Sequence, residues 1–379
     1  MLRFLSLFLL LLAAGGSLLA QAPASERNVA RPGVKEVQIP FASLRPTATF
    51  KIGGSADWVL ATENAVWVAG TKPYSVQRID PRTNRIIAKV RLSGEACSGL
   101  GFGFESVWVP LCGEHPALVR ISALTNRITA TLPIAPAAAE GGIAASGDSV
   151  WMVTDKNGTL SRIDPKANRV RQTVSVPLGS FNPVFSDGII WVTGFETSVV
   201  TAVDASSGSV VLSIAVGPKP RFLTTGAGSI WTLNQGDGTI SRIDEKSRKV
   251  KATIQAGIPG IGGDICFGEE SVWATVFDVP LTRIDARTDK VSRQWVGRGG
   301  DSLRVGHGSL WLTDYHRGLL WRIPDSQLSG IPAETLYSIH SKENRDDAKK
   351  SLRLSELPKI ALPRPQKAWW PKRLKPFAG

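Results

Sequence analysis

The chain contains few of the residues that most often carry chemistry. Its 379 residues include three cysteines and four histidines, and none of them has the spacing of a zinc site or of a CxxCH haem motif. We also find no nucleophile elbow and no glycine loop of the kind that cradles phosphate. These absences remove the common motif-based assignments and direct attention to the architecture.

Tryptophan recurs about every forty residues, each time inside a phrase of the Ser-Val-Trp-Val type. The seven copies are Trp67, Trp108, Trp151, Trp191, Trp231, Trp273 and Trp311. A repeat of this length is typical of a four-stranded propeller blade, which cannot bury its apolar face alone and must stack on its neighbours. We expect the Trp side chains to fill the gaps between sheets. The sequence therefore predicts an all-β, seven-bladed β-propeller over residues 47–324.

An Arg-Ile-Asp-type triplet follows each tryptophan and precedes a turn. It is complete in four copies, such as Arg78-Ile79-Asp80, and differs most in the fourth, Ala202-Val203-Asp204. We expect the Asp to accept hydrogen bonds from its own turn and the Arg to lie along an outer sheet face. Four residues after the Asp position stands a residue that tolerates a left-handed backbone, with Arg248 as the exception. The other copies are Asn84, Asn126, Asn168, Gly208 and Asp289.

The last copy of the repeat is incomplete. It ends after Arg322-Ile323-Pro324, whereas Ala48–Gly53, ahead of the first copy, matches Ala252–Gly257 of the fifth. We therefore expect residues 48–53 to form the outer strand of the seventh blade. This arrangement would close the ring and protect the sheet edges.

The two ends of the chain differ from the repeats. Residues 1–22 have the charged, apolar and small-residue order of a secretory signal, and the absence of a following Cys favours a soluble periplasmic or secreted product, with a signal anchor as the alternative. Residues 23–46 form an N-terminal extension. Residues 325–379 contain eleven Lys or Arg and six Asp or Glu, part of a net charge of +13. This basic tail is expected to be disordered and could contact a protein or an anionic surface. We expect a monomer that does not bind nucleic acid.

Two of the cysteines have informative positions. If residues 103–106 form a turn, Cys97 and Cys112 fall opposite each other on neighbouring strands. In an oxidising compartment they could form a disulfide, although two small buried thiols are the alternative.

Side chains that differ between the copies gather at one end of the predicted channel. Strand starts place Asp57, Arg221 and Asp301 around its mouth, and the loops between second and third strands add further polar groups. This set could hold a small polar ligand, a glycan or a peptide, while the acids alone could bind Mg²⁺ or Ca²⁺. No metal ligand or cofactor is assigned. The candidate ligand-binding residues are Asp57, Trp58, Tyr74, Glu140, Asn182, Arg221, Asp264, Asp301, Tyr315 and Arg317.

The repeats resemble a known group of propellers. Ser-Val-Trp-Val, Arg-Ile-Asp-Pro-x-Thr-Asn-Arg-Ile and Ala-Thr-Ile-x-x-Gly are similar to phrases of the YVTN-type repeats and of the virginiamycin B lyase (streptogramin lyase) family of seven-bladed propellers. The resemblance covers about residues 47–324. It implies an elimination that opens a cyclic depsipeptide ester, with magnesium and with His and Glu side chains of the late blades.

The chain departs from that family where the chemistry should lie. The strand starts of blades five to seven read Pro220-Arg221-Phe222, Gly262-Gly263-Asp264 and Gly300-Asp301-Ser302, so none offers a histidine. If the protein is an enzyme, His316 and Asp301 are the candidate catalytic residues, because proton abstraction needs a tuned base beside the substrate. We therefore favour a binding scaffold and keep a lyase or hydrolase with a rebuilt site as the alternative.

Overall fold

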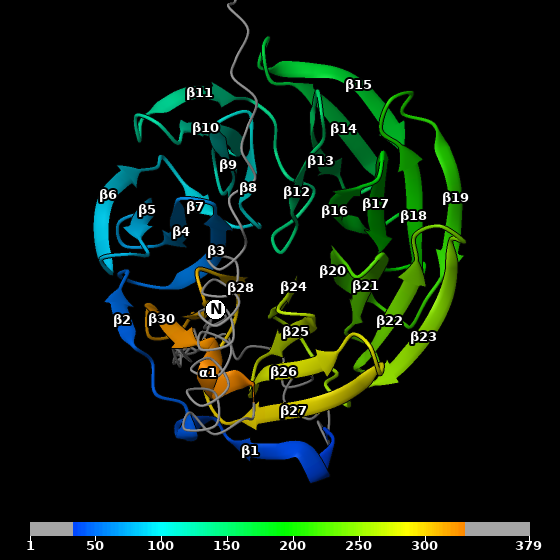
Figure 1. The fold of residues 1–379 in the computed structure, drawn as a ribbon. Helices are drawn as coiled ribbons and strands as arrows, with labels where there is room; N and C mark the ends of the chain where they lie inside the picture. Colours follow the sequence, from blue (N-terminus) through cyan, green and yellow to red (C-terminus); the bar gives the residue numbers. More distant parts are fainter. Residues whose placement is uncertain (1–32, 330–379) are drawn as a thin grey trace, which may run out of the picture. The chain divides into compact units, whose positions relative to one another are not determined.

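The computed structural model describes residues 33–329. The chain divides into two units, Met1–Asp325 and Ser326–Gly379, and seven β-sheets belong to the first. Within this unit the sheets surround a common axis (Figure 1), and the innermost strand of each sheet contacts that of the next all the way round. The fold is therefore a seven-bladed β-propeller, as predicted. The predicted signal at residues 1–22 and the tail beyond residue 329 lie outside the described residues.

Apart from the two N-terminal strands described below, the strands of each blade are antiparallel and follow one another outward from the axis in chain order; the inner strand of blade 2 consists of two short pieces. Blade 1 consists of β3 (Ala56–Thr62), β4 (Ala65–Gly70), β5 (Ser75–Asp80) and β6 (Arg85–Arg91). Blade 2 consists of β7 (Glu95–Ala96) with β8 (Gly101–Gly103), β9 (Ser106–Cys112), β10 (Ala117–Ser122) and β11 (Ile128–Leu132). Blade 3 consists of β12 (Ile143–Ala145), β13 (Val150–Asp155), β14 (Thr159–Asp164) and β15 (Arg169–Ser175). Blade 4 consists of β16 (Ser180–Ser186), β17 (Ile189–Gly194), β18 (Val199–Asp204) and β19 (Val210–Ala215). Blade 5 consists of β20 (Pro220–Gly226), β21 (Ser229–Asn234), β22 (Thr239–Asp244) and β23 (Lys249–Gln255). Blade 6 contains β24 (Asp264–Gly268), β25 (Ser271–Val276), β26 (Val279–Asp285) and β27 (Lys290–Val296).

Blade 7 is closed by the N-terminal strand. Its chain-order strands are β28 (Leu303–Gly306), β29 (Ser309–Asp314) and β30 (Leu319–Pro324), and β2 (Ala48–Lys51) pairs antiparallel with β30. Phe50 of β2 is buried and packs on the ring of Trp311, with 6.0 Å between the ring centroids. The predicted closure is confirmed. A short helix, α1 (Asp325–Leu328), follows β30.

The segment before β2 adds a strand that the sequence did not predict. β1 (Gln38–Pro40), between 3-10 turns at Lys35–Val37 and Phe41–Ser43, pairs in parallel with β27 and makes blade 6 five-stranded. The side chain of Gln294 in β27 is fully buried: its Oε1 accepts a hydrogen bond from the Val34 amide (2.7 Å), and its Nε2 donates to the Ala256 carbonyl (2.8 Å). One amide thus joins the N-terminal segment to blades 5 and 6, because both its donor and its acceptor are used.

The repeated tryptophans are at most 2% exposed, which confirms that they fill the core between sheets. The repeated Asp side chains accept hydrogen bonds from their own turns, as Asp164 does from the Lys166 and Ala167 amides. The turn residues predicted to be left-handed, such as Asn84, have φ between about 50° and 74°, and the exceptional residue Arg248 has the same conformation, with φ 55°. These local predictions are confirmed because each depends on neighbours within one blade.

The repeated arginines correct the prediction of an outer-face position. Arg242 is 5% exposed, lies over the ring of Trp231 and donates to the Ala286 carbonyl and to Asp289 in the next blade, each at 2.7 Å. Arg78, Arg120, Arg162 and Arg322 likewise lie over the tryptophan of their own blade and donate to the turn of the following blade. These guanidinium groups therefore connect neighbouring blades.

Cys97 and Cys112 form a disulfide, with 5.7 Å between their Cα atoms. Their register differs from the prediction: Cys112 pairs with Glu95, and the Cys97 amide donates to the Pro110 carbonyl. The interruption between β7 and β8 shifts the first piece of the inner strand by two residues. The cysteines are therefore diagonal neighbours rather than opposite ones. The third cysteine, Cys266, is buried and free.

Candidate functional site

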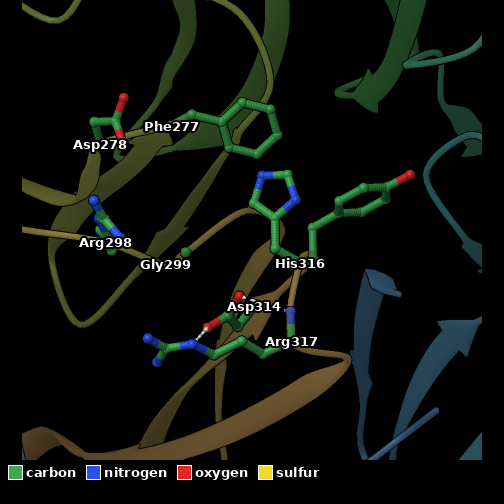
Figure 2. Close-up of a pocket in the computed structure, with 9 residues that line it drawn as sticks. Phe277, Asp278, Arg298, Gly299, Asp314, His316 and Arg317 are labelled. Carbon is green, nitrogen blue, oxygen red and sulfur yellow. Dashed lines mark hydrogen bonds and ion pairs between the residues drawn. The ribbon is translucent and has the colours of Figure 1, made fainter. Parts of the chain in front are cut away.

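A pocket of about 440 Å³ lies between blades 6 and 7, at the end of the propeller where the inner strands begin. Its walls come from the turn after β25, from the connection between β27 and β28, and from the turn after β29 (Figure 2). Tyr315, His316 and Arg317, three of the residues singled out from the sequence, line it. We call this space the interblade pocket.

One wall of the interblade pocket is aromatic. The imidazole of His316 lies 5.6 Å from the ring of Phe277 and 5.5 Å from the ring of Tyr315, measured between centroids. Figure 2 shows His316 beside Phe277, with both side chains directed into the same space. Flat rings of this kind can pack on apolar or cationic parts of a ligand.

The opposite wall is charged. The Arg317 Nε lies 3.7 Å from Oδ2 of Asp314, and the side chain of Asp314 is 3% exposed while that of Arg317 is 62% exposed (Figure 2). Arg298 also lines this side. The pocket therefore combines a ring surface with groups of both charges.

Sequence reasoning missed Phe277, Asp278, Arg298 and Gly299 as lining residues. One signal was available, because glycines surround Arg298 at the entrance to the last blade. Gly299 has φ 103°, and a Cβ there would lie 3.2 Å from Oδ2 of Asp314. A larger residue would therefore be strained and would crowd the acid in the wall.

Next to this pocket, four acids from different parts of the ring lie near enough to one another for their charges to interact. They are Asp57 of β3, Glu140 in the connection from β11 to β12, Asp264 of β24, and Asp301 just before β28. We call them the acidic well. The structure thus brings together four of the residues predicted from the sequence, which lie more than 240 positions apart at the extremes.

Burial and repulsion between like charges raise the pKa of Asp57, Asp301 and Glu140. Burial is the main cause that raises the pKa of Asp57 well above its ordinary value, and the charges of Asp301 and Glu140 add to it. The same causes raise the pKa of Asp301, opposed by the hydrogen bond that its Oδ1 accepts from the Gly263 amide (2.9 Å). Burial raises the pKa of Glu140 to about 7. Several like charges without enough cations favour protonated acids.

Asp264 differs from the other acids because it is fully paired. Its Oδ2 lies 2.5 Å from Nη1 of Arg304 and accepts a hydrogen bond from the Ser302 hydroxyl at 2.8 Å. Ser302 Oγ in turn accepts a hydrogen bond from the Val59 amide (3.2 Å). Through these hydrogen bonds the ionised Asp264 side chain connects blade 6 to blade 7 and, through Ser302, to blade 1.

Arg221 is held by the protein. Its Nη2 donates to the Ala139 carbonyl (2.7 Å) and its Nε to the Glu140 carbonyl (3.3 Å), while the guanidinium lies 4.3 Å from the ring centroid of Phe181. Its charge lowers the pKa of Glu140 against the larger effect of burial. Arg221 is thus beside the acidic well with its donors partly used.

The remaining predicted residues have different positions. The Asn182 side chain donates to the Glu140 and Arg221 carbonyls at 2.9 and 2.8 Å, so it fixes both loops. Trp58 is 2% exposed and lines a small cavity of about 70 Å³ with Asn182 and Asp264. Tyr74 is 41% exposed and does not line the interblade pocket.

The part of the chain that the structure describes contains no cluster of three or more His, Cys, Asp or Glu side chains arranged to hold a metal ion. Mg²⁺ or Ca²⁺ at the mouth stays a prediction, as do the catalytic roles of His316 and Asp301. No helix within residues 33–329 is both long and apolar enough to cross a membrane.

The fold defines the class: the chain is a seven-bladed β-propeller, with a polar pocket between blades 6 and 7. No protein-family model matches the chain, and no curated protein matches it. The resemblance to YVTN-type repeats and virginiamycin B lyases therefore stays a prediction. Among solved structures, the chain is similar to the crystal structure of BamB from Moraxella catarrhalis, with a TM-score of 0.53 and 12% identity, over 74% of this chain and 97% of that one. At this identity the likeness shows the fold.

Proposed function

We propose that this protein is an exported propeller that acts as a binding scaffold, and that its ligand site comprises the interblade pocket and the acidic well. The observation that carries the proposal is the pocket of about 440 Å³, a volume in the range of small-ligand sites, lined by rings and by groups of both charges. A small polar molecule, a glycan or a peptide would fit this chemistry. Export to the periplasm or the medium rests on the predicted signal at residues 1–22, and contact with a protein or an anionic surface rests on the basic tail.

Thermal unfolding of the full chain tests this function. A ligand that binds only the folded protein at a hundred times its Kd stabilises it by about 2.7 kcal/mol, which for a domain of about 300 residues is about 4 °C in Tm. We expect such a shift from a member of a panel of small carboxylates, sugars, peptides and amines, and a smaller one in His316→Ala and Arg317→Ala. The control is Arg287→Ala, which removes an exposed arginine from a turn between outer strands. Compounds that stabilise all the proteins equally, or a panel without any stabilising compound, would overturn the assignment.

A second function is a lyase or hydrolase of the virginiamycin B lyase type. The observation that favours it is the position of His316 in a pocket wall that also contains the buried Asp314. Its test is the opening of a cyclic depsipeptide ester with and without Mg²⁺. Activity that is lost on His316→Ala and on chelation would support the enzyme; an intact substrate after prolonged incubation would contradict it.

A further inference from the structure

Asp57 has the least compensated charge of the acidic well. It is 8% exposed, yet it has no hydrogen bond and no ion pair with any residue that the structure describes. Asp264, by contrast, is paired with Arg304, and Asp301 accepts a backbone hydrogen bond. A buried carboxylate without a partner is costly, so a buried acid in this state indicates a missing cation or a retained proton.

The direction of the Asp57 side chain follows from its neighbours. The charges that act on it belong to Asp301, Glu140, Glu95 and Asp264, which come from four other blades or their connections. Asp57 has the same repeat position as Ser98 and Asp301, whose side chains accept hydrogen bonds from the amides of neighbouring blades around the channel mouth, at 3.2 Å for Ser98 and 2.9 Å for Asp301. In the described part of the chain, several side-chain atoms are fully buried without a hydrogen-bond partner, and the Asp57 oxygens are not among them. Since these oxygens have no partner, they must be partly accessible to solvent. Asp57 is therefore directed into the acidic well.

The acidic well is adjacent to the interblade pocket, because Gly300, the residue directly before Asp301, lines that pocket. Tyr315, which lines the pocket, also lies within the field of Asp57, Glu95 and Asp301, and these charges add to the effect of burial in raising its pKa. His316 and Phe277 continue the ring surface away from the well. A ligand that reaches from the pocket to the axis therefore meets rings first and unpaired carboxylates last.

We propose that the acidic well binds a primary alkylammonium group, with Asp57 and Asp301 as its acceptors and with the attached chain lying along Tyr315 and His316. The inference rests on the proposed function, whose ligand it specifies. An ammonium group has three donors and one positive charge, which suits carboxylates from several blades better than a neutral donor does. An alkyl chain and its cationic end both pack favourably on aromatic faces. A lysine side chain and a free diamine share this chemistry.

The test is calorimetric titration of the full chain with Nα-acetyl-lysine methylamide and 1,5-diaminopentane. The matched control ligand is Nα-acetyl-norleucine methylamide, which has the same side chain without the ammonium group. We expect the amines to bind and the norleucine compound to bind at least tenfold more weakly. Binding of the lysine compound and not of the diamine would assign the source as a peptide, and the reverse would assign a free amine; either supports the ammonium site.

Two variants locate the site. Asp57→Asn and Asp301→Asn should each weaken amine binding by about 10- to 100-fold, as expected for the loss of a charge-assisted hydrogen bond, while Asn at 301 can still accept the Gly263 hydrogen bond. The control, Asp187→Asn, removes the same charge from an exposed turn at the opposite end of the ring, where φ is 45° and Asn is well tolerated. Thermal unfolding confirms that each variant is folded.

Calorimetry in two buffers of different ionisation enthalpy measures the number of protons released on binding. This number would not change if Asp57 and Asp301 had only a structural role. Because Asp57 and Asp301 hold protons more tightly in the free protein, amine binding near pH 7 should release protons, and less so in the variants. Equal binding of the norleucine compound, or unchanged affinity in both Asn variants, would overturn the ammonium site. If the amines fail while another compound of the panel stabilises the wild type and not His316→Ala, the inference fails and the binding function stands. If a divalent metal alone binds through these acids, the ammonium proposal is wrong.

Discussion

The arginine that connects one blade to the next gives the sharpest test of how this ring is held together. Arg242→Ala removes a side chain whose Nε donates to Ser229 Oγ (2.9 Å) and whose Nη1 lies 2.7 Å from both the Ala286 carbonyl and Asp289. The guanidinium also lies 4.5 Å from the ring centroid of Trp231. The substitution therefore breaks bonds within blade 5 and between blades 5 and 6 at once.

The expected loss in the free energy of unfolding follows from the groups that Arg242→Ala leaves without a partner, namely Asp289 and the Ala286 carbonyl. Removing one partner of a buried ion pair costs about 3–5 kcal/mol, and the lower part of that range applies because Asp289 remains 25% exposed. An unpaired carbonyl and the lost cation–π contact are included in an expected total of about 3–4 kcal/mol. Unfolding of a domain of about 300 residues has an entropy of about 0.6 kcal/mol/K, so Tm should fall by about 5–7 °C.

The assay is thermal unfolding monitored by tryptophan fluorescence, with Arg287→Ala as the control. Arg287 is 77% exposed and lies 3.7 Å from Asp285, so its loss should change Tm by less than about 1 °C. Combining Arg242→Ala with Asp289→Asn should cost less than the two single changes together, since the acid has already lost its partner. A shift for Arg242→Ala no larger than that of the control, or strict additivity with Asp289→Asn, would refute the reasoning.

Three further predictions concern the well, the disulfide and the closure. Burial and like charges raise the pKa of Asp301 to about 8; because the folded state holds this proton more tightly than the unfolded chain, wild-type stability should decline as pH rises from about 4 to 8. Asp301→Asn should remove much of that decline and be more stable at pH 9, and identical Tm profiles over pH 4.5–9 would contradict this. Replacing Cys97 and Cys112 by Ser opens a loop with a sequence separation of 15 and should cost about 3 kcal/mol in equilibrium unfolding, whereas an unchanged midpoint in the oxidised protein would argue against the bond. Phe50→Ala should cost about 3–5 kcal/mol, because the ring is 6% exposed and packs on Trp311; a loss below about 1 kcal/mol in urea unfolding would show that β2 does not hold the ring closed.

The exceptions in the repeat show how far one sequence can predict its own packing. Arg248 stands where other copies have Asn, Asp or Gly, and Ala202 stands where other copies have Arg. The structure explains why these two exceptions occur together. The repeated arginine of one blade donates to the turn of the next blade, and by this rule an arginine at position 202 of blade 4 would face the turn of blade 5 that contains Arg248. A donor and its acceptor are therefore replaced together, which avoids opposing two cations. Both exceptions are visible in the sequence, but the sequence does not show that the arginine of one blade contacts the turn of the following blade.

The site was predictable in part for a similar reason. Asp57 and Asp301 could be placed at one end of the ring, since each occupies the same position in its repeat, and Asp264 could be placed beside them because it stands one position later in its own repeat. The pairing of Asp264 with Arg304, and the isolation of Asp57, depend on which side chains meet across blades, and no pattern within one repeat specifies that. Phe277 and Arg298 were missed because turns of different length bring them to the pocket.

By itself, the sequence determined the number of blades, the buried tryptophans, the left-handed turns and the closure by Ala48–Lys51, because each of these follows from a period or from contacts within about forty residues. Only the tertiary structure decided the parallel pairing of β1 with β27, the diagonal register of Cys97 and Cys112, and which acids at the channel mouth are buried with a partner and which without one. These features join segments that are distant in the chain or shifted by an irregular strand. Their energies depend on burial and on charges from other blades, and both of these arise only when the ring has folded and closed.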